Sequence, residues 1–163
     1  MRNTLDRFLS KYNDPDLYFL HADMWSFKRF NERFPNRCIN VGIQEPNMIN
    51  IAGGLASQGK KVIVYGVAGF VIHRAYEQIK FSVKNFGDNV IFVNAGANGC
   101  YKIAGKGHIL DDDAQVMSAL GIELIEPIDR SSFLRAVTDS IRCSGTQYIR
   151  LGWDNCGWKI NEE

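Results

Sequence analysis

The sequence is 163 residues long, with a formal net charge of +1, 45% hydrophobic residues and 23% charged residues. This length and composition suit one globular domain with a sizeable core. Because acidic and basic residues are balanced, charge does not support a nucleic acid or an anionic membrane as the main partner. No apolar run approaches the roughly 20 residues that cross a bilayer, and the polar N-terminus lacks the apolar region of a signal peptide.

The four scattered cysteines form no CxxC pair, which argues against a zinc site and favours free thiols in the cytoplasm.

Short β-rich segments alternate with helical patterns along the chain. The predicted strands are residues 17–22, 37–42, 61–69, 89–96, 121–127 and 146–152. The predicted helices are residues 3–12, 26–33, 46–58, 71–86, 112–119 and 130–143. Several strands are apolar on both faces, as expected when helices cover both sides of a sheet. The pattern predicts an α/β fold with a doubly wound, mainly parallel sheet and helices on both faces, in which ligands bind at the carboxyl ends of the strands.

One carboxylate, Glu45, stands where an apolar segment turns into a predicted helix, directly before Pro46. A glutamate at this place can simply complement the helix dipole. The helix that follows is almost entirely small and apolar, however, and contains two adjacent glycines, Gly53 and Gly54. Each glycine weakens a helix interior by roughly 1 kcal/mol relative to alanine, which is expected where another backbone packs very close, as at a subunit contact. A carboxyl group buried at such a contact could share a proton with a ligand.

The order and spacing of several motifs resemble the pyrimidine-binding domain of the transketolase family, which includes deoxyxylulose phosphate synthase. Residues 42–45, Gly-Ile-Gln-Glu, match a G-I-x-E motif that opens a small-residue helix. Phe70 and Tyr76 match an aromatic segment after the next strand, and the loop GANGCYKIAGKGH matches a glycine-rich loop that ends in a histidine, here His108. The resemblance covers roughly residues 15–152 and implies the thiamine diphosphate-binding fold, pyrimidine domain.

The resemblance implies roles for individual side chains around thiamine diphosphate. Glu45 is expected to meet N1′ of the aminopyrimidine ring and to share a proton with it. His108 is expected to reach towards the thiazolium and the substrate, which makes these two the predicted catalytic residues. The predicted cofactor-binding residues are Glu45, Phe70, His73, Tyr76 and Asp23. Two of them leave an alternative open: the position of His73 usually carries an aromatic residue, and Asp23 could equally cap the following helix.

The predicted substrate site departs from the family pattern. Members that use sugar phosphates carry a histidine early in the glycine-rich loop, an acidic residue four positions before the final histidine, and an arginine after the last strand. Here these positions are Gly96, Ala104 and Trp153. A phosphate needs fixed donors or positive charge, so we expect a substrate other than the standard pentose phosphates, or a phosphate held differently. The candidate substrate-binding residues are His108, Lys106 and Arg150.

The resemblance also implies a missing part. The family holds the diphosphate and Mg²⁺ with a separate domain that bears a G-D-G…N motif, whereas the Gly-Asp pair at residues 87–88 runs directly into a strand. Residues 111–113, Asp-Asp-Asp, are interpreted as an acidic helix start, so no metal ligand is expected in this chain. We therefore interpret residues 1–163 as a single pyrimidine-binding domain, with no diphosphate-binding domain and no C-terminal domain in this chain. A second subunit would supply the diphosphate-binding domain in an α2β2 heterotetramer, a split enzyme that transfers a two-carbon ketol unit between sugars or sugar derivatives.

Three other functions stay open. The loop GCYKIAGKG resembles a nucleotide phosphate loop, but its glycine spacing is wrong and Gly107 replaces the hydroxyl residue that would bind Mg²⁺. A subunit of a thiamine diphosphate-dependent 2-oxo acid decarboxylase or synthase is the second alternative, against which the G-I-x-E and G-x-x-H motifs favour the transketolase branch. A non-catalytic assembly subunit is the third, against which stands the presence of Glu45, Phe70, Tyr76 and His108 together.

Overall fold

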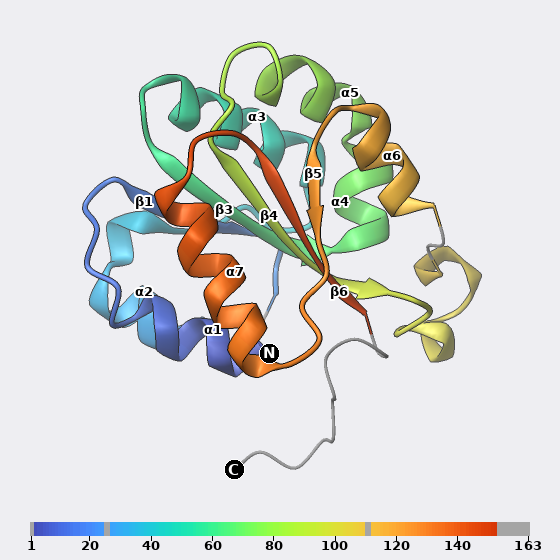
Figure 1. The fold of residues 1–163 in the computed structure, drawn as a ribbon, viewed down its shortest axis with the longest axis horizontal. Helices are drawn as coiled ribbons and strands as arrows, with labels where there is room; N and C mark the ends of the chain where they lie inside the picture. The colour runs from blue at the N-terminus through green and yellow to red at the C-terminus, as the bar shows by residue number, and fades with distance from the viewer. Residues whose placement is uncertain (1, 25–26, 110–111, 153–163) are drawn as a thin grey trace.

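In the computed structural model, which describes residues 2–24, 27–109 and 112–152, six strands form one sheet in the order β2-β1-β3-β4-β6-β5 (Figure 1). Every pairing between neighbouring strands is parallel. The strands are β1 (Leu17–His21), β2 (Cys38–Asn40), β3 (Lys61–Val67), β4 (Val90–Ala97), β5 (Glu123–Ile125) and β6 (Gln147–Gly152). The prediction of a parallel, doubly wound α/β sheet is confirmed, and all six predicted strands are present in it.

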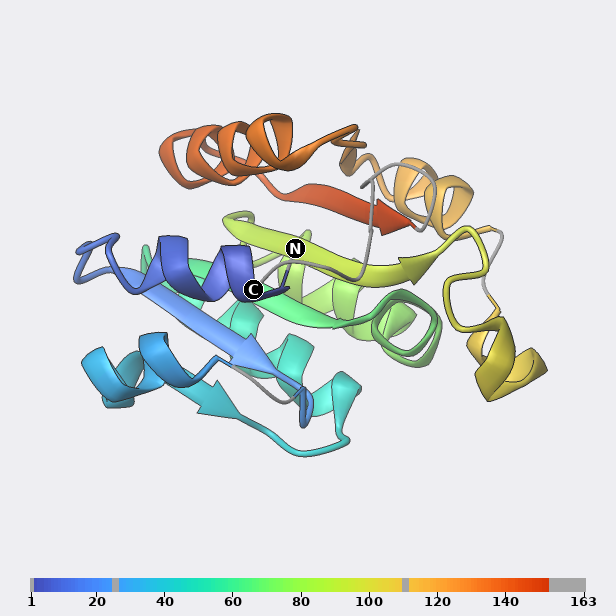
Figure 2. The same cartoon turned by 90° about the horizontal axis from the view of Figure 1, so that it is seen from below.

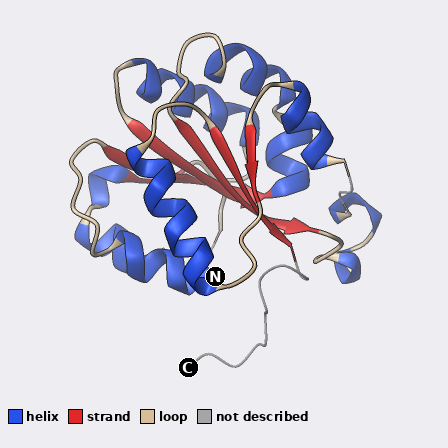
Figure 3. Ribbon diagram, viewed as in Figure 1, coloured by secondary structure: helices blue, strands red, loops and turns tan. Residues whose placement is uncertain are grey.

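Helices connect the strands and cover both faces of the sheet (Figure 3). They are α1 (Arg2–Leu9), α2 (Lys28–Arg33), α3 (Glu45–Ser57), α4 (Ala68–Arg74), α5 (Tyr76–Gln78), α6 (Asp113–Ala119) and α7 (Arg130–Arg142). Short 3₁₀ turns lie at Pro35–Arg37, Lys102–Ala104 and Lys106–His108. Among the described residues, no helix is long and apolar enough to span a membrane.

The prediction of one continuous helix over residues 71–86 is wrong in detail. Helix α4 begins directly where β3 ends, and the helix is interrupted at Ala75. A π-helical turn, Ile79–Val83, follows α5. The π-helical turn lies where this segment contacts α3, and there the Ser82 hydroxyl donates a hydrogen bond to Asn50 Oδ1 at 2.7 Å. Tertiary contact has therefore reshaped a segment whose local periodicity is helical throughout.

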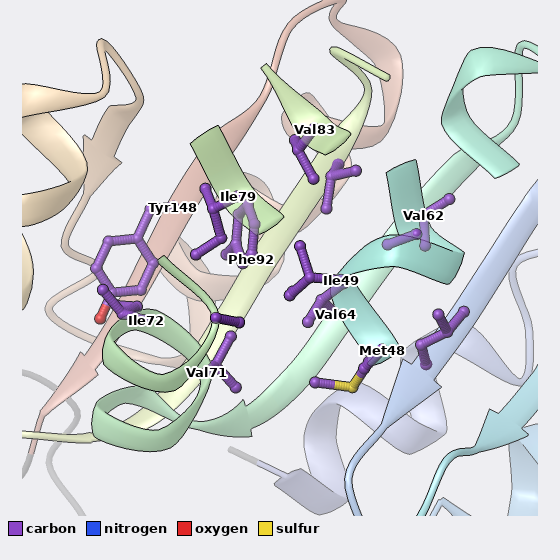
Figure 4. Close-up of a cluster of buried hydrophobic side chains, with 14 of the residues drawn as sticks. Met48, Ile49, Val62, Val64, Val71, Ile72, Ile79, Val83, Phe92 and Tyr148 are labelled. Carbon is purple, nitrogen blue, oxygen red and sulfur yellow. The ribbon is translucent and has the colours of Figure 1, made fainter. Parts of the chain in front are cut away.

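The sheet separates two apolar clusters, so the molecule has three layers (Figure 2). Helices α3, α4 and α6 enclose one cluster with β3, β4 and β6, and its side chains interdigitate closely (Figure 4). Helices α1, α2 and α7 enclose the other. The sheet contributes to both clusters because successive side chains of a strand point to opposite faces. In β3, Val62 and Val64 belong to the first cluster, while Ile63 and Tyr65 belong to the second. Each such fully buried apolar side chain stabilises the fold by about 1.5–3 kcal/mol.

The close backbone contact predicted for the glycines of α3 exists, but it lies within this chain. A Cβ atom on Gly53 would come within 2.4 Å of the Ser82 carbonyl oxygen. A Cβ atom on Gly87 would in turn come within 2.6 Å of the Gly53 carbonyl oxygen. Gly54 faces open space and is exposed. Gly53 is therefore explained by packing inside the domain, not by a subunit contact, and only Gly54 lies on the outer surface.

The sheet topology gathers the candidate residues at one edge. Strands β1, β2, β3 and β4 are parallel, so the segments that follow them begin at the same edge of the sheet. The chain leaves β1 towards β2 but continues from β3 towards β4, which makes the β1–β3 boundary the point where the winding direction reverses. Crevices at such a point are the usual ligand sites of open α/β sheets.

We predict opposite effects for the two adjacent glycines of α3. Gly53→Ala should lower the free energy of unfolding by about 2–4 kcal/mol, because the added methyl group overlaps the Ser82 backbone. Gly54→Ala should be neutral or should stabilise the domain by up to about 1 kcal/mol, because it only improves helix propensity. Urea unfolding of the two variants and the parent chain measures both values. Equal effects at the two positions would contradict this packing.

Candidate functional site

Glu45 is the first residue of α3, and its side chain is 5% exposed. The turn before it contains Gly42 with φ +71°, a conformation that favours glycine, and the Gly42 amide donates to Asn40 Oδ1 at 3.0 Å. Pro46 then fixes the backbone at the start of the helix. Arg74 Nη1 lies 3.4 Å from both carboxylate oxygens of Glu45. The turn thus directs a carboxylate into the protein, where one guanidinium nitrogen reaches it.

Phe70 and His108 contact each other, and Arg74 links Phe70 to this carboxylate. Phe70 belongs to α4, which starts immediately after β3 and approaches the strand so closely that a Cβ atom on Gly66 would lie 2.6 Å from Val71 Cγ2. The Phe70 and His108 rings contact each other edge to face, with centroids 4.8 Å apart. Arg74 Cζ lies 3.8 Å from the centroid of the Phe70 ring. Through Arg74 the structure brings together three predicted site residues that are up to 63 positions apart in the sequence (45 to 108).

Arg74 is the one member of this cluster that the sequence prediction missed. The available signal was its spacing, because residues four apart on a helix lie on the same face and Arg74 follows Phe70 by four. Nothing in the sequence alone shows that Arg74 contacts Glu45, which lies 29 residues earlier.

The other predicted cofactor-binding residues lie around this cluster. His73 Nε2 is 3.0 Å from Asp112 Oδ1, so its imidazole joins α4 to the residue that precedes α6. Tyr76 is 40% exposed on α5. Asp23 has a left-handed backbone with φ +50°, its amide donates to Asn40 Oδ1 at 2.9 Å, and its carboxylate accepts from Asn40 Nδ2 at 3.3 Å. Since the residue that precedes α2 is Phe27, Asp23 does not cap that helix, and the capping alternative is wrong.

Asp23 lines an open pocket at the carboxyl ends of β1 and β2, together with His21, Lys28 and Asn40. Burial lowers the pKa of His21, and the nearby charge of Asp23 opposes this shift. The neutral imidazole is also required by geometry, because its Nδ1 accepts a hydrogen bond from the Met24 amide at 3.2 Å. A proton on the other nitrogen, Nε2, then leaves a donor in the pocket.

Of the predicted substrate-binding residues, Lys106 is exposed on the 3₁₀ turn that ends at His108. Arg150 lies in a buried network instead. Its Nε and Nη2 donate to the two oxygens of Asp113 at 2.7 and 2.9 Å, and its Nη1 donates to Glu126 at 2.7 Å. The Tyr148 hydroxyl also donates to Asp113, at 2.6 Å, and burial followed by the Asp113 charge raises the Tyr148 pKa well above its usual value. A role for Arg150 in substrate binding stays a prediction, and its contacts favour a structural role.

Two aspartates of the acidic triplet, Asp112 and Asp113, make separate ion pairs. Asp112 pairs with His73 of α4, while Asp113, which is fully buried, opens α6 and pairs with Arg150 of β6. Asp111 lies outside the described residues, as does Trp153. Within the ranges that the structure describes, no group of three or more His, Cys, Asp or Glu side chains could hold a metal ion.

The site has the chemistry that the pyrimidine end of a thiamine cofactor requires. A buried carboxylate suits proton sharing with a ring nitrogen, and the Phe70 ring offers an aromatic face for stacking. The described residues thus fit the aminopyrimidine ring.

Comparison with known proteins gives the same assignment. Residues 3–155 match the family model described as transketolase, pyrimidine binding domain. A protein of Clostridium sp. (strain MSTE9), named 6-deoxy-6-sulfo-D-fructose transketolase subunit SqwH, is 32% identical over 157 residues, covering 93% of this chain and 49% of that protein. One of the subunits of an apulose-4-phosphate transketolase from Actinobacillus succinogenes is 33% identical over 152 residues, covering 90% of this chain and 49% of that protein. The chain therefore spans about half the length of these curated relatives.

A solved structure has the same fold over nearly the whole chain. It is described as a split gene transketolase in the form of an inactive β4 tetramer, and it superimposes with a TM-score of 0.80 at 26% sequence identity. The match covers 99% of this chain and 53% of that one.

We predict that Arg150→Leu lowers the free energy of unfolding by about 3–5 kcal/mol, because it leaves the buried Asp113 carboxylate without its cation. The double variant Asp113→Leu/Arg150→Leu should recover most of this loss, since replacing both members of a buried pair is often neutral. As a milder control, Tyr148→Phe should cost about 1.5–3 kcal/mol for its lost hydrogen bond to a charged group. Thermal and urea unfolding measure these effects, and an unchanged stability of Arg150→Leu would argue for a substrate-binding role.

Proposed function

Because the chain belongs to the transketolase family through its pyrimidine-binding domain, we propose that it forms the pyrimidine half of the active site of a two-component, thiamine diphosphate-dependent enzyme. The proposed reaction is transfer of a two-carbon ketol unit between sugars or sugar derivatives. The observation that carries the proposal is the buried carboxylate of Glu45 at the carboxyl edge of the sheet, which Arg74 links to Phe70, while Phe70 in turn contacts His108.

Glu45, Phe70 and His108 would each have a different role at the cofactor. When bound, thiamine diphosphate supplies a thiazolium carbon that adds to a substrate carbonyl. Glu45 would hold a proton at N1′ of the aminopyrimidine, and its burial strengthens that interaction because the local dielectric constant is low. Phe70 would stack on the ring. His108, half-buried against Phe70, would donate or accept a proton at a substrate oxygen.

A second subunit would complete the site by holding the diphosphate and Mg²⁺, in the α2β2 arrangement expected from the sequence. Two of the relatives are named as subunits, and the solved split-gene transketolase is described as an inactive β4 tetramer. Ile43, two residues before Glu45, is 69% exposed, and Tyr76 is 40% exposed. A second subunit seated over them would remove both side chains from water. The cytoplasmic location remains a prediction.

The substrate would be a specialised sugar. The relatives are named for a sulfosugar, 6-deoxy-6-sulfo-D-fructose, and for apulose 4-phosphate, rather than for the common pentose phosphates. In this chain Gly96 and Ala104 stand where family members that use sugar phosphates carry a histidine and an acidic residue. Lys102 and Lys106, both exposed on the same loop, offer positive charge for an anionic group instead.

We expect Glu45→Gln to reduce turnover of the reconstituted two-subunit enzyme by about 10²–10⁴-fold, because an amide cannot exchange a proton with N1′. Glu77→Gln, an exposed glutamate on α5, is the matched control and should leave turnover unchanged. The partner is obtained by co-expression with the protein encoded next to this one, and ketol transfer is measured with thiamine diphosphate and Mg²⁺. Unchanged turnover of Glu45→Gln would make the catalytic assignment untenable, and release of carbon dioxide with an aldehyde product would identify a decarboxylase.

Substrate choice gives a separate prediction. The reconstituted enzyme should transfer ketol units from a sulfosugar at least about tenfold more efficiently, as kcat/KM, than from xylulose 5-phosphate to ribose 5-phosphate. The physical reason is the missing set of phosphate donors, since one lost donor to a charged group costs about 1.4 kcal/mol or more, which is tenfold. Full activity with the pentose phosphate pair would contradict it.

A further inference from the structure

Arg74 lies between the two groups that the proposed function assigns to the cofactor ring. Its guanidinium carbon is 3.8 Å from the centroid of the Phe70 ring, and its Nη1 is 3.4 Å from both oxygens of Glu45. We propose that Arg74 is a displaceable occupant of the aminopyrimidine site, which fills the space between Phe70 and Glu45 in the free chain and leaves it when the ring binds. This inference rests on the proposed function and adds to it a residue that competes with the cofactor.

The chemistry of the two groups explains the competition. A guanidinium is planar and delocalised, stacks on aromatic faces, and presents N–H donors to a carboxylate. An aminopyrimidine is also planar and rich in nitrogen, and it would stack on Phe70 and meet Glu45 with a ring nitrogen. Since Arg74 uses both of these partners at once, it and the ring cannot be bound together in this place.

Arg74 is the neighbour of Phe70 that the ring has to displace. The His108 ring meets the Phe70 ring at 67°, edge to face, and its centroid also lies 6.5 Å from that of the Tyr101 ring. His108 thus approaches Phe70 from the glycine-rich loop, whereas Arg74 contacts both Glu45 and Phe70. A ring that stacks on Phe70 and reaches Glu45 therefore takes the position of the guanidinium.

The contacts of Arg74 are strong enough to hold it and weak enough to release it. Its side chain is 47% exposed, and 3.4 Å is long for a charge-assisted hydrogen bond, so solvent screens the pairing. The Glu45 side chain is only 5% exposed, and a buried carboxylate without a partner is costly. Arg74 thus supplies a partner to Glu45 in the free chain, and the half-exposed arginine can turn towards solvent when another donor arrives.

The first test measures cofactor affinity in the complex with the partner subunit. Titration calorimetry with thiamine diphosphate in excess Mg²⁺ should show that Arg74→Ala and Arg74→Gln bind about three- to tenfold more tightly than the parent, because the competing group is gone. Arg37→Ala is the matched control: Arg37 Cζ lies 3.9 Å over the Phe34 ring, away from Glu45, and its loss should leave the affinity unchanged. Unchanged or weaker binding by both Arg74 variants overturns the inference.

A second test restores the occupant from solution. Millimolar ethylguanidinium chloride should enter the vacated space in Arg74→Ala and weaken cofactor binding back towards the parent value, whereas the same concentration of sodium chloride should not. The parent complex should show no such competition, and its presence there would also overturn the inference. These outcomes are distinct from failure of the proposed function, in which the parent complex would not bind thiamine diphosphate at all.

Discussion

A carboxylate that is 5% exposed has lost most of its hydration, and from the described part of the chain Glu45 receives one guanidinium nitrogen, 3.4 Å from each of its oxygens. The N-terminus of a 13-residue helix favours its charge as well. Asp113 shows what full compensation looks like in the same domain: it is completely buried, yet it accepts three hydrogen bonds of 2.6–2.9 Å from Tyr148 and Arg150. Buried polar groups are normally satisfied in this second way. Among the described residues, Glu45 thus has longer and fewer polar contacts than Asp113, as the proposed cofactor site requires.

The position of this carboxylate depends on how closely two helical segments approach the sheet and each other. Gly66 lets α4 start against β3, and Gly53 lets α3 contact the backbone of Ser82. Interiors packed in this way transmit small displacements, because close contacts leave no free space to absorb them. The two glycines consequently fix the distance between the first turn of α3, which bears Glu45, and α4, which bears Phe70. Substitution at either would shift Glu45 relative to Phe70 as well as change stability.

The sequence predicted the parallel sheet and all six strands, because strand periodicity and helix starts are encoded locally. It considered burial of Glu45 only at a subunit contact, whereas the residue is already buried within this chain. It did not predict features that arise from long-range contacts between side chains. Arg74 meets Glu45 across 29 positions, and Arg150 meets Asp113 across 37. The glycines of α3 correctly indicate close backbone packing, but composition does not reveal whether that backbone belongs to the same chain. The π-helical turn was missed for the same reason, since the contact with α3 overrides a continuous helical pattern.

A site that a resident side chain fills for part of the time binds its ligand with an affinity reduced by the fraction of molecules in which the site is free. In an active site shared by two subunits, the lower affinity accompanies a benefit to the free subunit. The buried Glu45 carboxylate keeps a cationic partner while the domain is alone, so the free subunit does not carry an uncompensated buried charge. Contacts from a second subunit to the rest of the cofactor would then supply the free energy that moves Arg74 away. Cofactor binding and subunit assembly would become coupled through one half-exposed arginine, because each favours the arrangement in which Glu45 faces the ring.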